Sequence, residues 1–182
     1  SHAHYDHCFP EVFQWQPKGR QIQWVVSSDV SAPPAAHRMA PHETLQLPQM
    51  EVRTLFSTDQ GVAFLVKVDG LTICHAGDLH WWHWEDEPQE TNQWMKETYQ
   101  REIASLEGEH IHLAMVPVDP RQQHNCLLGL HWLLTHCTVD HVAPMHFWDD
   151  PSIFDVIAQD PQTQPYRHKI LPLAHPGDST TL

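Results

Sequence analysis

The sequence has few basic residues. Lys and Arg total 10, against 23 Asp and Glu in 182 residues, which gives a formal net charge of -13. This balance argues against a surface that follows nucleic-acid phosphates, because such surfaces are rich in Lys and Arg. It leaves a small anionic substrate open, because a bound metal ion can reverse the local field. No apolar run approaches the roughly 20 residues that span a bilayer, so we expect no membrane partner.

The chain also lacks paired cysteines and internal repeats. Its four cysteines include no CxxC pair and no dense framework. This usage is typical of reduced thiols, so we expect a cytoplasmic protein. The length suits one domain over residues 1–182, with enough chain to bury a sizeable core.

Histidine, in contrast, is abundant, with 17 in the chain, and it is concentrated at the start. The opening "SHAHYDH" places His2, His4, Asp6 and His7 within six positions. From the composition, this H-x-H-x-D-H pattern is expected about 0.01 times by chance, and affinity tags use consecutive histidines instead. In an extended turn, His2 and His4 point the same way and can share one metal ion. Asp6 and His7 follow the bend and can reach a second ion.

The rest of the chain alternates between patterns typical of strands and of helices. "GVAFLVKVDGLTICHAGD" predicts a hairpin that turns at Asp69-Gly70 and whose second strand leads to Asp78. Residues 89–107 predict a helix, because apolar side chains recur at helical spacing up to Gly108. Further predicted segments are a short helix from Pro10, strands over 21–28, 111–118, 139–147 and 166–173, a buried helix over 126–137, a short helix over 151–159 and an irregular connection over 31–43.

Three segments that carry potential metal ligands lie at the ends of predicted strands. The opening motif, "HAGD" with Asp78, and "PMH" with His146 each lie on or just beyond a predicted strand end. A parallel or mixed sheet gathers such ends at one edge. Four ligands in six residues cannot complete two coordination shells, so Asp78 and His146 are the natural additions.

These motifs resemble the metallo-β-lactamase superfamily of metal-dependent hydrolases. "SHAHYDH", "HAGDLH" and "APMHFW" are similar to three motifs of that family and occur in the same order. The stretches "STDQGVAFLV", "HAGDLHWWHW", "VPVDPR" and "PMHFW" are most similar to its ascorbate-phosphate-lactonase-like group. The resemblance implies an α/β sandwich of mixed sheets packed face to face, with helices outside and metals at one sheet edge.

The resemblance also implies roles for individual residues. His2 and His4 would bind a first metal, Asp6 and His7 a second, Asp78 would bridge them, and His146 would complete the second shell. Asp6 and Asp78 would be the catalytic carboxylates. The cofactor would be one or two zinc ions, with manganese or iron as alternatives. A metal-bound hydroxide would cleave a small-molecule ester, phosphoester or lactone.

The chain departs from the family pattern at two places. Ser57, in "FSTDQG", stands where the family usually has another histidine, so a single metal is an open alternative. His75 or His80 could substitute, although His75 lies on an apolar strand and fits a supporting role better. The family also has strands before its first motif, so we expect that roughly 40–50 residues of a domain of this size precede Ser1.

Several interpretations stay open at this point. Three tryptophans in "WWHWED", together with Trp148, either wall a substrate pocket or pack in the core or an interface. Arg121 either holds a substrate anion or pairs with Asp119. The alternatives to a hydrolase are a non-catalytic metal-binding protein with a degraded site and a nuclease of the same superfamily. An iron-dependent redox enzyme has only ligand type in its favour, and a homo-oligomer is compatible with the sequence.

Overall fold

The computed structural model describes residues 1–15 and 22–181, and within them it has two sheets. The larger sheet has six strands in the order β3-β4-β5-β6-β7-β8, and the smaller one pairs β1 with β2. Neighbours from β3 to β6 are antiparallel, whereas β6, β7 and β8 are parallel. The strands are β1 (Val25–Ser27), β2 (His37–Met39), β3 (Thr44–Leu47), β4 (Met50–Phe56), β5 (Val62–Val68), β6 (Leu71–His75), β7 (His110–Pro117) and β8 (Thr138–Met145).

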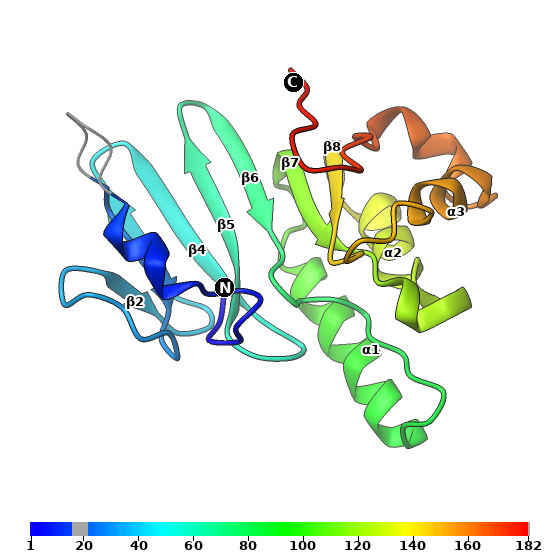
Figure 1. The fold of residues 1–182 in the computed structure, drawn as a ribbon, viewed down its shortest axis with the longest axis horizontal. Coiled ribbons are helices and arrows are strands. Elements are labelled where there is room, and N and C mark those ends of the chain that lie inside the picture. The colour runs from blue at the N-terminus through cyan, green and yellow to red at the C-terminus, as the bar shows by residue number, and fades with distance from the viewer. Residues whose placement is uncertain (16–21, 182) are drawn as a thin grey trace.

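The helices gather around the parallel half of the large sheet. Figure 1 shows α1, α2 and α3 near β7 and β8, with β2 beside the antiparallel strands. The helices are α1 (Gln89–Ala104), α2 (Leu128–His136) and α3 (Ile153–Gln159), with short 3₁₀ helices η1 (Pro10–Gln14), η2 (Pro120–Asn125) and η3 (Gln164–Lys169). A mixed sheet with helices confirms the predicted α/β class. None of the described helices is long and apolar enough to cross a membrane.

The predicted hairpin forms between β5 and β6. Val68 pairs with Leu71 across the two-residue turn. Asp69 and Gly70 both have positive φ, 51° and 79°, as a type I′ turn requires. This turn fixes the register of β6 and therefore the position at which the chain leaves the sheet toward Asp78.

The helix predicted over 89–107 is also confirmed, with α1 ending slightly earlier, at Ala104. Tyr99, Ile103 and Leu106 are all less than 5% exposed and belong to the main hydrophobic core. Gly108 follows with φ 85° and ends the turn. The buried side chains hold α1 against the strands that lead to the sheet edge.

The strand predicted over 166–173 is wrong. Residues Gln164–Lys169 form η3, and only Ile170 makes a bridge, to Val142 of β8. The extended stretch is stopped by Pro172, which has no N–H to donate to a ladder.

The irregular connection predicted over 31–43 contains a strand that sequence reasoning missed. Within it, β2 pairs in parallel with β1, and the start of the pairing is the bond from the His37 N–H to the carbonyl of Trp24. The strand predicted over 21–28 is shorter, because β1 begins at Val25, and its first residue, Gln21, lies outside the described residues. In place of two large sheets, the described chain has the six-stranded sheet and this small pair.

Candidate metal centre

Three parallel strands end at one edge of the large sheet, and each is followed by a polar side chain. Asp78 follows β6, Asp119 follows β7, and His146 follows β8. His146 has a positive φ of 66°, a conformation that costs free energy in a non-glycine residue and often marks functional sites. Its Nε2 lies 3.5 Å from Oδ1 of Asp78. The structure therefore brings Asp78 and His146 together, as the strand-end argument predicts.

The N-terminal loop reaches the same edge through a close backbone contact. The Val62 N–H donates to the carbonyl oxygen of Ser1 over 3.1 Å. A Cβ at Gly61 would lie 2.2 Å from that oxygen, and one at Gly77 would lie 2.6 Å from Cβ of Ser1. Both glycines also have positive φ. Only glycine at these two positions lets the loop pack this closely.

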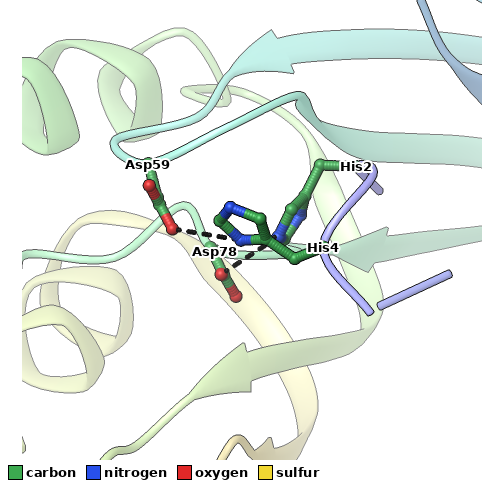
Figure 2. A group of neighbouring side chains, drawn as sticks. All are labelled: His2, His4, Asp59 and Asp78. Carbon is green, nitrogen blue, oxygen red and sulfur yellow. Dashed lines mark hydrogen bonds and ion pairs between the residues drawn. The ribbon is translucent and has the colours of Figure 1, made fainter. Parts of the chain in front are cut away.

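The first group of candidate ligands consists of His2, His4, Asp59 and Asp78, whose ligand atoms lie within 4.8 Å of one another. His2 Nε2 lies 3.0 Å from His4 Nδ1 and 3.4 Å from Oδ2 of Asp78. Oδ2 of Asp59 lies 3.8 Å from His4 Nδ1. Figure 2 shows the four side chains converging from the N-terminal loop and from the loops after β4 and β6.

The second group consists of Asp6, His7 and His146, with ligand atoms within the same 4.8 Å limit. His7 Nε2 lies 3.7 Å from Oδ2 of Asp6 and 3.2 Å from Oδ1 of Asp78. Asp78 thus faces the first group with Oδ2 and the second with Oδ1. This is the arrangement of a carboxylate that joins two ion sites.

Hydrogen bonds engage the outer ring nitrogens of three histidines. Ser1 Oγ lies 3.2 Å from Nδ1 of His2 and 3.3 Å from Nδ1 of His7. His146 donates from Nδ1 to Oδ2 of Asp119 over 3.0 Å. This bond leaves the lone pair of a neutral His146 ring on Nε2, and in all three residues Nε2 is the atom that faces Asp78. Such outer partners are typical of metal-ligating histidines.

Burial and charge also fit a cation at this place. Oδ1 of Asp78 is buried and has no hydrogen-bond partner among the described residues, although an unpaired buried carboxylate oxygen is costly. Burial raises the pKa of Asp78 above its ordinary value, against the opposing effect of His7 and His146. A cation between the two groups would supply the missing partner. The donor set, imidazole nitrogen with carboxylate oxygen, suits zinc and iron.

Burial favours the neutral form of two histidines of the N-terminal motif, His2 and His7. Burial, followed by the neighbouring His7 and His4, lowers the pKa of His2 to about 4. Burial also lowers the pKa of His7. For His146, burial works in the same direction, but the hydrogen bond to Asp119 and the charge of Asp78 outweigh it and raise the pKa. Neutral imidazole is the form that binds metal.

Asp59 is the member of the cluster that sequence reasoning missed. It lies two residues after Ser57, in the stretch where the expected histidine is absent. The Asp59 N–H donates to Ser57 Oγ over 3.2 Å, which forms a turn that presents the carboxylate to His4. Thr58 Oγ also donates to the carbonyl of His80. The signal in the sequence was a carboxylate within the same short loop as Ser57.

His75 and His80, the suggested substitutes for that histidine, lie outside both ligand groups. His75 Nδ1 accepts a bond from the Gly77 N–H, so this side chain supports the loop before Asp78. His80 is buried, pairs through Nε2 with Oε1 of Gln122, and packs on Gly129. Burial lowers the pKa of His80 to about 4.

A cavity of about 450 Å³ opens beside the two groups. Trp82 and Trp84, from the "WWHWED" stretch, and Trp148 line it, whereas Trp81 packs against Trp132 instead. Arg121 pairs with Asp119, as one of the two interpretations expected, and it also lines the cavity. Its full lining is His4, Tyr5, Asp6, Asp59, Asp78, Trp82, Trp84, Met95, Arg121, His146 and Trp148.

A third cluster of potential ligands, His110, His112 and Asp140, lies at the opposite ends of β7 and β8. There the Thr72 N–H donates to Nδ1 of His112 over 3.0 Å, which leaves the ring proton on Nε2. His110 Nε2 is engaged with Oδ2 of Asp140 over 2.8 Å. Neutral His112 therefore has no free lone pair to offer, and this cluster is a poor metal site.

Comparison with known proteins finds solved structures with a similar fold. No family model and no curated protein matches the sequence. Among solved structures, the CmlA β-hydroxylase E377D mutant has a TM-score of 0.52 at 11% identity, over 81% of this chain and 37% of its own. CmlA from Streptomyces venezuelae, described as a diiron β-hydroxylase, has a TM-score of 0.44 at 10% identity, over 69% of this chain and 30% of its own.

A further solved structure comes from Thermotoga maritima and is described as a candidate Zn-dependent hydrolase of the metallo-β-lactamase superfamily. It has a TM-score of 0.37 at 13% identity, over 69% of this chain and 61% of its own. The chain thus spans less than two thirds of each of these structures. At such identities the likeness concerns the fold alone.

Proposed function

We propose that this protein is a metal-dependent hydrolase that cleaves a small-molecule ester, phosphoester or lactone. The observation that carries the proposal is the position of Asp78, a buried carboxylate whose two oxygens face two separate groups of ligands. Paired sites of this kind serve hydrolysis in several classes of enzyme. The acidic surface and the cavity beside the ligands favour a small molecule over a nucleic acid.

The ligand set divides between two ions, with zinc as the first expectation. His2, His4 and Asp59 would hold one ion, and Asp6, His7 and His146 the other, while Asp78 serves both. Ser57 does not leave the first site short of ligands, because Asp59 supplies a carboxylate in the same loop. When bound, the ions would supply Lewis acidity and water activated near neutral pH.

Residues around the ligands orient the ligand side chains and limit the access of water. Asp119 is fully buried and fixes the ring of His146, so that Nε2 stays directed at Asp78. Asp6 is partly exposed and borders the cavity, where its carboxylate can orient a water molecule or move a proton. Trp82 donates from its indole N–H to the carbonyl of Asp78, which fixes the loop and keeps water from that side.

The test is hydrolysis of a panel of small phosphoesters, carboxylic esters and lactones by the zinc-loaded protein. We expect at least one class to be cleaved, and we expect Asp78→Ala to abolish the cleavage. Asp140→Ala, in the distal cluster, is the matched control and should leave activity unchanged. Metal analysis of the same preparations gives the stoichiometry. Bound metal without any cleavage would favour a non-catalytic metal-binding protein, and cleavage of RNA alone would favour the nuclease.

A second candidate function is oxygen-dependent chemistry at a pair of iron ions. One solved structure with a TM-score above 0.5 is described as a β-hydroxylase, and a related structure is described as a diiron enzyme. The His and Asp donors also suit iron. Iron in the purified protein, with oxygen consumption that Asp78→Ala removes and no hydrolysis, would support this candidate over the first.

A further inference from the structure

The cavity beside the ligands has an aromatic wall of unusual density. Trp82 and Trp148 both make edge contacts with the ring of His146, with centroids 5.5 and 5.7 Å apart. Trp84 stacks on Trp82 with an interplanar angle of 7°. Three indoles therefore extend outward from the ligands. Trp148 is 50% exposed, although a large aromatic side chain gains most from burial.

Arg121 lies beside this wall, next to Trp84 and Trp148. Its guanidinium is 4.9 Å from the ring centre of Trp148 and 5.8 Å from that of Trp84. Nε and Nη2 bond to Asp119, while no hydrogen bond is found for Nη1 among the described residues. The guanidinium is thus held near two indoles by Asp119 and keeps donors for a further partner.

The cavity contains charges of both signs. Its carboxylates, Asp6, Asp59 and Asp78, belong to the ligand groups, and Arg121 is its single Lys or Arg among the described lining residues. On a chain with a net charge of -13, this one cation is an exception to the general field. It is suited to a carboxylate or phosphate that enters beside the indoles.

We propose that the cavity selects a flat, conjugated substrate that carries an anionic group in addition to the bond to be cleaved. The planar part lies along Trp82, Trp84 and Trp148, and the anion accepts hydrogen bonds from Arg121. This inference rests on the proposed function only for the position of the scissile bond at the ligand groups. The binding preference itself follows from the wall and the guanidinium.

The experiment is isothermal titration calorimetry on the zinc-loaded protein with three matched probes. These are 2-naphthoate, its saturated analogue decahydro-2-naphthoate, and the neutral 2-naphthalenemethanol. We expect 2-naphthoate to bind at least about tenfold more tightly than either of the others, because it alone offers both a π-face and an anion. Equal affinity of all three probes would overturn the proposal.

Two variants separate the wall from the cation. Trp148→Leu should weaken 2-naphthoate about tenfold and leave the saturated anion nearly unchanged. Arg121→Gln should weaken both anions and leave the neutral alcohol unchanged. The matched controls are Trp94→Leu, at an exposed tryptophan on α1, and Arg167→Gln, at an exposed arginine on η3; neither should alter binding.

The outcomes distinguish this inference from the proposed function. A carboxylate that bound only to the metal ions would bind equally well to both variants, which would overturn the inference even if the protein is a hydrolase. The expected pattern of affinities in a protein that hydrolyses nothing would sustain the inference and reject the hydrolase.

Discussion

The two ends of β7 and β8 carry similar residues and differ in how their imidazoles are bonded. At the carboxyl end, Nε2 of His146 is left free because Asp119 accepts from Nδ1. At the amino end, His112 has its Nδ1 occupied by the Thr72 N–H. The first cluster is also buried around an oxygen without a partner, whereas His110 and Asp140 satisfy each other at the surface. Residue type and proximity alone thus do not define a metal site; the bonds on the outer ring nitrogens do.

Removing the Asp78 carboxylate, which lies between the two ligand groups, tests the difference between the two strand ends most directly. Asp78→Ala should lower zinc affinity by more than about a hundredfold, which exceeds the effect of losing an outer partner. Asp140→Ala should leave it unchanged. Competition with a chromophoric chelator measures both. Equal affinities in the two variants would remove the distinction between the clusters.

Altering an outer partner should have the next largest effect. In Asp119→Asn, the amide can donate to Nδ1 of His146 and so favour the tautomer with a proton on Nε2. We expect a loss of about 10- to 100-fold in zinc affinity. Arg121→Gln, which keeps the Asp119 carboxylate as the acceptor for His146, is the control. It removes a positive charge and should not weaken zinc binding, so an equal loss there would assign the effect to a displaced Asp119 instead of the lost acceptor.

A change in the loop after β4 should have a smaller effect on metal binding. Asp59→Ala should weaken one of two bound ions about tenfold, because this carboxylate is 46% exposed and is one ligand of several. Asp59→His should restore the affinity. Metal content by mass spectrometry after dialysis tells the two variants apart. Full retention of two ions in Asp59→Ala would exclude this carboxylate from the centre.

At the amino end of the strands, we expect no effect on metal content. His112→Ala should bind as much zinc as the unchanged protein, because the Thr72 N–H already occupies the ring. Equilibrium dialysis at several zinc concentrations measures the stoichiometry. A loss of one ion per chain would show that the surface cluster does bind, and the tautomer argument would be wrong.

The smallest effect concerns the pH dependence of stability at the same surface cluster. The hydrogen bond from His110 lowers the pKa of Asp140 in the folded protein. The bond therefore stabilises the fold at pH values above the ordinary carboxyl pKa, and this contribution is lost as pH falls through the lowered pKa. Asp140→Asn should reduce the urea midpoint slightly at pH 7 and not at pH 2. A larger difference at pH 2 would contradict this sign.

The sequence predicts the parts of the fold that depend on local pattern. The type I′ turn at Asp69-Gly70 and the core-facing side of α1 follow from residue identity and periodicity. The strand expected near Ile170 does not form, because strand pairing depends on tertiary contacts. Only one bridge, to Val142, is made before Pro172. β2 was missed because three residues between prolines carry little periodic signal.

The candidate centre divides in the same way. His2 and His7 share one motif, and strand ends bring Asp78 and His146 to it, so these could be placed from sequence. Asp59 could not, because its position depends on a turn made by Ser57. The bond from His146 to Asp119 likewise joins residues 27 positions apart, and no spacing in the sequence indicates it.

The close packing of the N-terminal loop on Gly61 and Gly77 has a consequence for how the centre responds to its ions. The loop brings three imidazoles and one carboxylate, and its exposed side chains include Tyr5, at 77%, and Phe9, at 67%. Ions that tie this loop to Asp78 would thus also shield a chymotrypsin cleavage region. Limited proteolysis, with and without a chelator, would then follow occupancy without any substrate.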